Sequence, residues 1–472
     1  NGGSIYIRNG GELSLHITIL YNNKARGGGG IYALGDSNTN TNNIIMNIYN
    51  SSIINNVATG YNEAGGIYMY KSIGHIYGSD ISNNECSSCI DGGMSIQYSD
   101  VSIKDTTISQ NNGKSSYYYG NGDVTRGRGV YIYGTNYHPT SVNITRCIIK
   151  NNGKYHNLYL QSRVTVTIRE TSFISTTSDL TNTNGHQLYA RGESDGIPTV
   201  SIINTYFNDP SRSNIIYENI NLPSNWNDCS SIPFPCTEAP FTGRCGAASN
   251  TNSKLGVICS PSSLTTCEND NEYLKMVFAS SVPSTFVCAP RSISSCNAGT
   301  FLKDGTFFTD ATCVSCTFGK YQATNGFTGN TCTNWTVCNE TEYVSTPGTL
   351  VSDVVCSVGV RADEWGCSTS NTVGTYVRGS NCQISGDNHV LLTGALEITG
   401  GSTDMNNLVT ITAANKKRHF KLDDATHKLT LRYLKLEGGD VSGASTDPDY
   451  YGGSIYNRNG GELSLHFTIL YN

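Results

Sequence analysis

The sequence has few charged residues and no long apolar run. Asp, Glu, Lys and Arg make up 14% of its 472 residues, against about 25% in an average soluble protein. The formal net charge of −6 leaves no basic surplus, so we expect no nucleic-acid partner. No apolar stretch reaches the roughly 18 residues of a membrane helix, so we also expect no membrane span.

A sustained helical period is also missing. Gly, Asn, Ser, Thr and Tyr take the place of charged residues, and these types favour strands and turns over helices. Runs such as 12–19 (ELSLHITI) and 164–168 (VTVTI) alternate apolar and polar residues with the period of a strand. The sequence therefore predicts an all-β fold.

A short repeat occupies residues 2–209. An apolar residue, usually followed by Tyr and a second apolar residue, begins at Ile5 and recurs in steps of 26, 36, 27, 36, 28 and 30 residues. Segments that end in paired Asn, such as 19–23 and 53–56, lie between these positions. Short strands, turns at fixed places and loops of variable length predict a right-handed parallel β-helix with about three strands per coil.

Side chains alternate across each strand of such a coil. Ile5 and Ile7 are expected to point into the core, whereas the Tyr between them points outward. The Tyr column either stabilises the sheet by stacking or forms an exposed docking stripe for sugars or subunits. Both interpretations concern Tyr6, Tyr32, Tyr68, Tyr131, Tyr159 and Tyr189. The paired Asn fit turns, because Asn tolerates the left-handed conformation and can bond to its equivalent in the next coil.

A second, longer repeat links the two ends of the sequence. Residues 2–22 and 452–472 are near-copies with an offset of 450 residues, and they differ only at Ile7/Asn457 and Ile17/Phe467. We expect the chain to be part of a longer polypeptide with a tandem repeat of about 450 residues. Residues 1–22 are then expected to stack on a preceding unit, so that the coil face at Gly2 is uncovered in this chain.

The cysteines are unevenly distributed. Of the 17 cysteines, 12 lie between Cys229 and Cys356, which indicates disulfides and an oxidising compartment. Zinc is the competing interpretation of Cys313 and Cys316, but no second CxxC or His pair accompanies them, and we expect no cofactor. The pairing within Cys229–Cys288 stays open.

Three further features bear on the redox compartment and location of the chain. Cys86 and Cys89 form either a loop disulfide or a redox pair, and the absence of a surrounding βαβ pattern favours the disulfide. Cys147 is left over by count, and it is expected as a buried free thiol or as an intermolecular disulfide. Four N-glycosylation sequons, which predict covalent glycans and an extracellular location, begin at Asn50, Asn143, Asn334 and Asn339.

Residues 296–356 carry a recognisable pattern. The segment contains CTNWTVC at 332–338 and PGTLVSDVVC at 347–356, and it resembles the cysteine-rich modules of the tumour necrosis factor receptor family. The resemblance implies the disulfides Cys296–Cys313, Cys316–Cys332 and Cys338–Cys356. Such modules are recognition units in receptors and rod-like spacers in secreted repeat proteins.

Strand patterns return after the cysteine-rich region. Runs such as 395–398 (ALEI) and 428–436 (KLTLRYLKL) resemble the opening coils of pectin-lyase-like β-helices. We expect Cys367 and Cys382 to form a disulfide over the opening cap. The predicted domains are thus a β-helix at 1–228, a cysteine-rich module at 229–295, a receptor-like module at 296–356, and the first coils of the next rod at 357–472. Residues 204–227 are expected to end the first solenoid and to form its cap.

The fold resemblance raises an enzymatic hypothesis, because many pectin-lyase-like proteins cleave polysaccharides with clustered acids. Acidic residues are sparse here and do not recur at ladder positions. Asp423 and Asp424 are adjacent and so would face opposite ways on a strand, which favours a turn. A cation site or a solvated loop are the alternatives for Asp440, Asp447 and Asp449. We expect no enzyme, no catalytic residue and no metal site.

The sequence favours a structural role. A secreted, glycosylated chain of β-helix rods joined by disulfide-rich modules is typical of an extracellular fibre or cell-surface appendage whose partners are its own copies. The overall pattern resembles large protist surface proteins, including filament and mastigoneme-like proteins. An adhesin that binds glycans or a host surface is the alternative, and a polysaccharide lyase or hydrolase is the third.

Overall fold

The structure is a computed structural model, and it describes a subset of the 472 residues. The described residues are 3–25, 27–36, 44–60, 64–87, 91–113, 129–152, 156–169, 171–174, 186–192, 196–203, 206–207, 215–218, 241–245, 255–261, 272–279, 282–290, 293–303, 311–316, 320–336, 342–346, 348–358, 364–385, 389–402, 407–414, 417–439 and 453–471.

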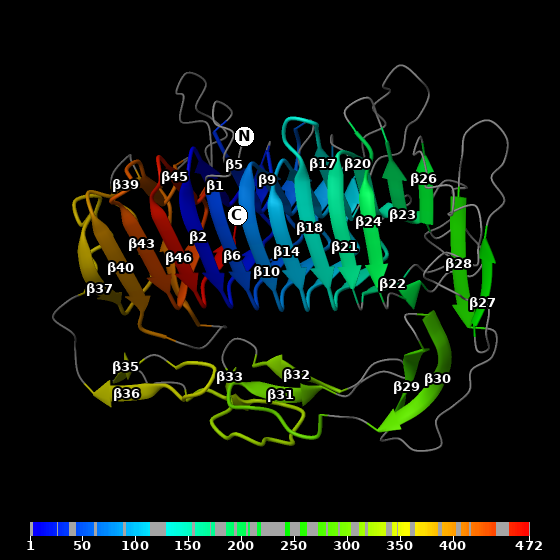
Figure 1. Ribbon diagram of the computed structural model, residues 1–472. Coiled ribbons are helices and arrows are strands. Elements are labelled where there is room, and N and C mark those ends of the chain that lie inside the picture. The colour runs from blue at the N-terminus through cyan, green and yellow to red at the C-terminus, as the bar shows by residue number, and fades with distance from the viewer. Residues whose placement is uncertain are drawn as a thin grey trace.

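The described part is all-β, and most of its strands form three long, largely parallel sheets (Figure 1). Sheet A has 13 strands in the order β39 (Val390–Leu391), β42 (Phe420–Leu422), β45 (Ile455–Arg458), β1 (Ile5–Arg8), β5 (Ile31–Leu34), β9 (Ile67–Tyr70), β13 (Met94–Gln97), β17 (Val130–Gly134), β20 (His156–Ser162), β23 (His186–Arg191), β26 (Ile215–Glu218), β28 (Leu255–Pro261) and β27 (Phe241–Cys245).

The other two long sheets have 11 strands each. Sheet B has the order β37 (Gly374–Arg378), β40 (Ala395–Gly400), β43 (Lys428–Arg432), β46 (Glu462–His466), β2 (Gly11–His16), β6 (Ile44–Tyr49), β10 (Ser72–Tyr77), β14 (Asp100–Lys104), β18 (Thr140–Thr145), β21 (Val164–Arg169) and β24 (Thr199–Ile203). Sheet C has the order β38 (Cys382–Gln383), β41 (Val409–Thr412), β44 (Leu434–Glu437), β47 (Ile469–Tyr471), β3 (Ile19–Tyr21), β7 (Ser52–Ile54), β11 (Asp80–Ser82), β15 (Thr107–Ser109), β19 (Ile148–Lys150), β22 (Ser172–Ile174) and β25 (Tyr206–Phe207).

The chain visits these sheets in turn. From β1 in sheet A it passes to β2 in sheet B and β3 in sheet C, and it returns to sheet A at β5, which pairs with β1. We call each such turn a coil, and the stack of coils is a β-helix-like solenoid. A short sheet D, which has the order β16 (Asn112–Gly113), β12 (Glu85–Cys86), β8 (Val57–Ala58) and β4 (Lys24–Ala25), widens four coils.

Alternation of side chains creates the core. In β2, Leu13 and Leu15 are buried, whereas the alternate residues Ser14 and His16 are partly exposed. Leu15 lies opposite Ile48 of the next coil, and the same inward positions continue as Ile76 and Ile103. Each fully buried aliphatic side chain contributes about 1.5–3 kcal/mol relative to its exposed state. The inward ladder therefore both stabilises the coils and fixes their register, since a slip of one residue would turn every side chain over.

Hydrogen-bonded ladders reinforce the corners between sheets. One Asn of each predicted pair is buried, and its amide bonds to the next equivalent: Asn56 Nδ2 donates to Asn84 Oδ1 at 3.0 Å, and Asn84 Nδ2 donates to Asn111 Oδ1 at 3.0 Å. The residue before it takes the left-handed conformation, with φ of 57° at Asn55 and 54° at Asn83. The ladder comprises Asn23, Asn56, Asn84, Asn111, Asn152 and Asn157.

One expectation about the solenoid is wrong in this chain. The coil face at Gly2 was expected to be uncovered, but β45 pairs with β1 in parallel and residues 453–471 form the adjoining coil. Residues 357–472 and 1–228 therefore contribute to one solenoid instead of two rods. The reason is that the near-copies share the same inward and outward pattern, so one stacks on the other in register.

The end of the solenoid also differs from the expectation. Strands β25 and β26 continue the parallel pairing into residues 204–227, the segment that was expected to end the solenoid and to form its cap. The cap instead includes part of the 229–295 region, because β28 pairs with β26 in antiparallel orientation and β27 pairs with β28. At the other end, Trp365 is fully buried and its ring lies 6.0 Å from Phe420, which covers the first coils.

The remaining strands are antiparallel hairpins that lie beside the solenoid (Figure 1). They are β29 (Glu272–Ala279) with β30 (Val282–Pro290), β31 (Thr300–Lys303) with β32 (Thr312–Ser315), β33 (Lys320–Tyr321) with β34 (Thr333–Asn334), and β35 (Glu342–Thr346) with β36 (Val355–Val358). The last three lie in the receptor-like module, with β36 extending two residues beyond position 356. From here on, the name cysteine-rich module refers to this part of the chain and not to residues 229–295.

The Asn ladder yields a stability prediction. Asn84→Ala removes the donor to Ile53 O, 2.8 Å away, and the acceptor of the Asn56 backbone N–H and Nδ2, both 3.0 Å away. Because these groups stay buried, we expect the free energy of unfolding to fall by about 2–3 kcal/mol. Urea denaturation of both proteins measures the change.

The control for this prediction is Asn83→Gly. The Asn83 side chain is exposed and its φ is 54°, a conformation that Gly adopts freely. We expect a change within about 0.5 kcal/mol. Equal denaturation midpoints for Asn84→Ala and the unsubstituted chain would contradict the structural role of the ladder.

Candidate functional site at the junction of the solenoid and the cysteine-rich module

The cysteine-rich module is held together by disulfides. Cys296 bonds to Cys313 and Cys316 bonds to Cys332, with Cα separations of 5.5 and 5.7 Å. These are two of the pairs that the family resemblance implies. Cys356 is also disulfide-bonded, whereas Cys338 lies outside the described residues. A small module of this kind has little core of its own and depends on such bonds for its shape.

Several residues that carry the resemblance are held together around Trp335. Trp335 is 5% exposed, and its Nε1 donates to Thr349 O at 3.1 Å. Gly348 packs so closely against the indole that an added Cβ would lie 2.7 Å from the ring. Thr336 N and Oγ1 each donate to the Asp353 carboxylate at 2.6 Å. Thr336, Gly348, Thr349 and Asp353 thus build one face of the module around Trp335.

That face lies against the solenoid. The Trp335 ring contacts Phe467 and Tyr433 edge-on, with centroid distances of 4.9 and 5.8 Å. Tyr433 and Phe467 stack on each other 5.0 Å apart, and the Tyr433 hydroxyl donates to Gly348 O at 2.6 Å. Burial raises the pKa of Tyr433 far above its ordinary value, so the phenol stays a donor. Leu408, Ile17 and Val354 complete this apolar cluster.

The docking surface is a row of corner residues between sheets B and C. The backbone of every member has a positive φ, in the left-handed region. Along the solenoid the row is Tyr433, Phe467, Ile17, Asn50, Gly78, Asp105 and Arg146. Asn, Asp and Gly are ordinary at such positions, whereas β-branched Ile17, with φ of 50°, is a genuine outlier. The first three members are apolar and contact the module.

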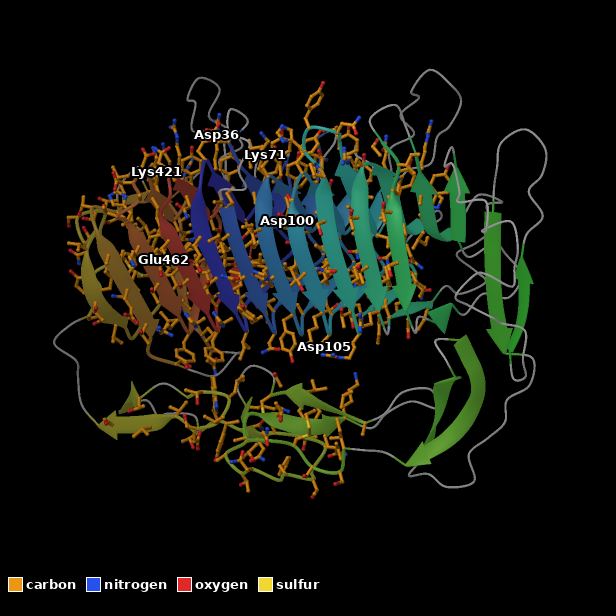
Figure 2. All side chains as sticks on the ribbon, in the orientation of Figure 1. Asp36, Lys71, Asp100, Asp105, Lys421 and Glu462 are labelled. Atoms are coloured by element: carbon orange, nitrogen blue, oxygen red, sulfur yellow. A yellow bond between two sulfur atoms is a disulfide. The ribbon has the colours of Figure 1, made fainter. Side chains whose placement is uncertain are left out.

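Further along, the row becomes charged. Arg146 Nε and Asp105 Oδ1 form an ion pair at 2.7 Å, and Asp105 lies at the solenoid edge that faces the module in Figure 2. This docking surface was not predicted from the sequence. The signal that could have found it is the Ile17/Phe467 difference, because an apolar residue at a turn position needs a packing partner.

A cavity of about 270 Å³ opens beside the docked module. Its wall on the solenoid includes His16, His466, Arg432 and Tyr49, and the 348–350 segment closes the other side. The imidazoles stack with a centroid distance of 4.8 Å and an interplanar angle of 3°, and Tyr49 stacks on His16 at 5.1 Å.

The electrostatics keep these imidazoles neutral. Burial, together with the positive charge of Arg432, lowers the pKa of His466 to about 3 and lowers the pKa of His16 as well. Arg432 is itself paired with Glu397 at 3.0 Å. Among the described residues that line the cavity, none is a carboxylate, so the cavity does not supply the paired acids of glycoside hydrolysis. The His16–His466 stack is therefore a neutral aromatic contact, and it becomes repulsive when both imidazoles are protonated.

The predicted Tyr stripe is not an exposed surface. Tyr6 and Tyr159 are at most 1% exposed, and Tyr32, Tyr68 and Tyr189 are at most 9% exposed. The rings do stack along the solenoid, with centroids 5.3 Å apart for Tyr6 and Tyr32 and 4.8 Å apart for Tyr32 and Tyr68. The expectation of an outward face is correct, but residues that precede the strands cover it; Ala64, for example, packs within the same cluster. Covering segments of this kind leave no trace in a strand pattern.

Two members of the Tyr column differ from the rest in their environment. Tyr131 is half-buried, and its hydroxyl donates to Gln161 Oε1 at 2.8 Å. Tyr456, the equivalent of Tyr6, is covered by the Arg418 guanidinium at 4.7 Å from the ring centroid. The described column therefore supports stacking within the chain and offers no continuous exposed stripe.

The other predicted site residues are dispersed. Asn143 and Asn334 are exposed, Asn50 is half-buried at the cavity, and Asn339 lies outside the described residues. Cys86 is disulfide-bonded and buried, while Cys89 is not described. Cys367 bonds to Cys382 at the start of sheet C.

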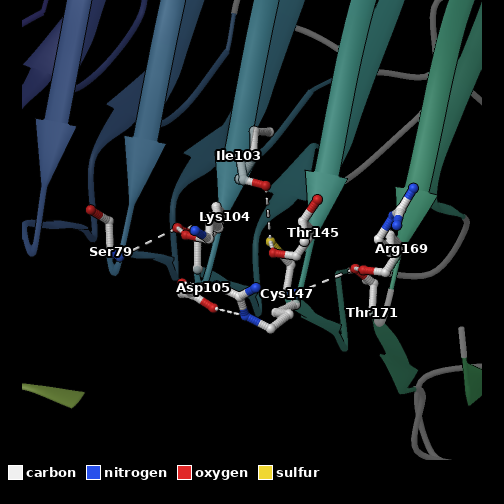
Figure 3. A network of polar contacts seen from close by, with 10 residues as sticks. Ser79, Ile103, Lys104, Asp105, Thr145, Cys147, Arg169 and Thr171 are labelled. Carbon is white, nitrogen blue, oxygen red and sulfur yellow. Dashed lines mark hydrogen bonds and ion pairs between the residues drawn. The ribbon is translucent and has the colours of Figure 1, made fainter. Parts of the chain in front are cut away.

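Cys147 is a buried free thiol that occupies a rung of a second ladder (Figure 3). Hydroxyls hold the equivalent corner positions, as shown by Thr18 N donating to Ser51 Oγ at 3.1 Å and Ser51 N donating to Ser79 Oγ at 3.2 Å. The Cys147 Sγ lies 3.3 Å from Thr145 O, and burial raises the pKa of this thiol to about 12. The Cys147 thiol therefore takes the place that Ser and Thr hydroxyls occupy at the equivalent corners.

The acidic candidates do not converge. Asp424 lies in a turn, where its Oδ1 accepts hydrogen bonds from Thr426 N and Oγ1 at 2.8 and 2.7 Å. Asp423 lies 3.5 Å from the Lys421 ammonium. Asp440, Asp447 and Asp449 lie outside the described residues. Within the described ranges, no group of three or more His, Cys, Asp or Glu is placed to hold a metal ion.

Comparisons with known proteins add no family. No protein-family model matches this chain, and no curated protein sequence matches it. Across the described residues, no helix has the length and apolar character needed to cross a membrane.

The docking contact yields a second prediction. Trp335→Ala removes the ring that bridges the module and the solenoid, so we expect residues 342–358 to exchange amide hydrogens at least tenfold faster. Tyr433→Phe removes only the hydrogen bond to Gly348, worth about 1 kcal/mol, and should give a several-fold increase. Hydrogen–deuterium exchange with mass spectrometry measures both. Tyr137→Phe is the control, since that side chain is 90% exposed; unchanged exchange in Trp335→Ala would contradict the docking.

The stacked imidazoles yield a third prediction. Since their pKa values are lowered in the folded chain, the unfolded chain binds more protons between about pH 3 and the ordinary imidazole pKa of about 6.5. The free energy of unfolding therefore falls as the pH is lowered through this window. His16→Gln with His466→Gln should flatten the slope, by up to about 1.4 kcal/mol per pH unit for each imidazole.

Urea denaturation at pH 4, 5, 6 and 7 checks this dependence. His138→Gln is the matched control, because its ring packs on Tyr98 at a different corner. Identical slopes in the double variant and the unsubstituted chain would show that the stack does not remain neutral.

Proposed function

We propose that this chain is a structural subunit of a secreted, glycosylated extracellular fibre or cell-surface appendage. In this proposal the solenoid is a right-handed parallel β-helix with about three strands per coil, and the fibre repeats with a unit of about 450 residues. The observation that carries the proposal is the continuity of sheets A, B and C through residues 364–471 and 3–207. A rod that extends by adding similar coils, each in contact with its neighbours, is suited to forming a long structure that resists tension.

The side-chain ladders support a mechanical role. Inward aliphatic residues, buried Asn amides and corner hydroxyls each repeat along the axis, so neighbouring coils are fixed to one another at several places. The stacked Tyr rings add contacts on the outer face of sheet A, and cross-strand aromatic pairs contribute about 0.2–1 kcal/mol each. Rigidity is distributed over the rod instead of being concentrated at one site.

The cysteine-rich module acts in this proposal as a clamp and not as a spacer between rods. It resembles tumour necrosis factor receptor modules, but its Trp335 face is occupied by the solenoid corner. The disulfides fit an oxidising compartment, and exposed Asn143 and Asn334 fit glycan attachment. The adhesin alternative could not use the Tyr column as a continuous exposed stripe, because five of its six named Tyr side chains are buried.

Electron microscopy of the native material tests the proposal. Eleven strands at about 4.8 Å spacing span about 50 Å, so we expect filaments with an axial period of at least about 50 Å for each chain-length unit. Antibody raised against the cysteine-rich module should decorate the filaments at that period. Dispersed particles without an axial repeat would contradict the fibre proposal.

A further inference from the structure

The coil formed by residues 453–471 meets the coil formed by residues 3–23 in a self-matching contact. Strands β45, β46 and β47 pair in parallel with β1, β2 and β3, and each residue lies opposite its own equivalent 450 positions away. Ile5 meets Ile455, Leu13 meets Leu463 and Leu20 meets Leu470. We call this contact the homotypic coil interface.

Aromatic and polar contacts follow the same rule. His16 stacks on His466 at 4.8 Å and Tyr6 stacks on Tyr456 at 5.3 Å. The corner ladders also cross the interface. Thr18 Oγ1 donates to Leu465 O at 3.1 Å, and Asn23 Nδ2 donates to Leu470 O at 3.2 Å. The interface therefore has the side-chain ladders, the register and the backbone pairing of an interior coil contact.

The covalent chain does not run through this interface. The two stacked coils are connected along the chain only by the residues between them, which include the whole cysteine-rich module. The disulfides that the structure pairs, Cys296–Cys313, Cys316–Cys332 and Cys367–Cys382, do not bridge it either. If the two coils separate and each pairs with the complementary coil of another molecule, every pairing across the homotypic coil interface is restored.

We propose that a second copy of this chain occupies the homotypic coil interface: the 453–471 coil of one copy stacks on the 3–23 coil of the next in the register seen here. This inference rests on the proposed fibre function and names the surface by which copies join. Because the two faces belong to opposite sides of the coil stack, the contact is head-to-tail, and such contacts generate open filaments. In a closed chain the two coils pair within one molecule, whereas in a joined form each pairs with the complementary coil of another molecule. Both forms contain the same interface, so their ratio depends on the protein concentration.

A cysteine pair tests the proposal. Ser14 of β2 and Ser464 of β46 lie opposite each other, and both are partly exposed. Neighbouring strands are about 4.8 Å apart, which falls within the Cα range of a disulfide. Chains that carry only Ser14→Cys are mixed at high concentration with chains that carry only Ser464→Cys, and the mixture is mildly oxidised. We expect a reducible dimer whose yield rises with concentration, with peptides joined at positions 14 and 464.

The control replaces one partner with Thr165→Cys, an exposed position on the same face of sheet B but several strands away. Dimer formation no greater than with this control, at every concentration, would overturn the proposal. The chain carrying both Ser14→Cys and Ser464→Cys should cross-link within itself when dilute and between copies when concentrated. No cross-link in this chain would also overturn the proposal, because the register itself would then be wrong.

The result separates this inference from the fibre proposal. Filaments in native material without a cross-link between copies would overturn only the interface, since another surface would then join the units. A cross-link between copies without filaments in native material would support the interface and overturn the fibre proposal.

Discussion

The in-register stacking of coils is the constraint on which the rest of this structure depends. Strand side chains alternate with a period of two, so Leu13 can lie inside only if Ser14 lies outside, and the neighbouring coil must obey the same order. The buried Asn amides add a second condition, because each must find both a carbonyl and the next amide. A coil that satisfies these conditions is a template for another copy of itself. Residues 453–471 and 3–23 show that outcome directly.

The cysteine-rich module uses the same architecture in a different way. The left-handed corners of the solenoid normally suit Asn, Asp or Gly, but three successive corners carry Tyr433, Phe467 and Ile17. Backbone strain of about 1–3 kcal/mol at such a residue persists only where packing compensates for it. Trp335 supplies that packing for Tyr433 and Phe467, and Ile17 belongs to the same apolar cluster. The two differences between the near-copies therefore have structural consequences. Phe467 contacts the module, whereas Asn457 places a buried amide in the aliphatic ladder, where its Nδ2 donates to Gly461 O at 2.6 Å.

The all-β class, the inward positions and the left-handed Asn turns could be predicted from the sequence, because each follows from the period or chemistry of a few neighbouring residues. The pairing of Cys296 with Cys313 and of Cys316 with Cys332 came from a family resemblance and not from spacing. The docking of Trp335 on Phe467 could not be predicted, since it depends on which surfaces meet across more than a hundred residues. The burial of Tyr32 and Tyr68 was missed because strand periodicity gives the face of a side chain and not what covers it. Joining of copies through the same coil contact depends on the protein concentration, and no local sequence pattern predicts it.

Distances measured across sheet B test the central claim most directly. Thr430, Ser464, Ser14, Asn47, His75, Ser102 and Asn143 lie in one row of register partners. Spin labels at Thr430 and Asn143 are six strand spacings apart in this order, so pulsed electron resonance on dilute protein should give a narrow distribution near 29 Å between backbones. Labels at Thr430 and His75, four spacings apart, should give about 19 Å. A broad distribution, or a Thr430–Asn143 distance beyond about 50 Å alongside an ordered solenoid, would contradict the stacking of residues 453–471 on residues 3–23.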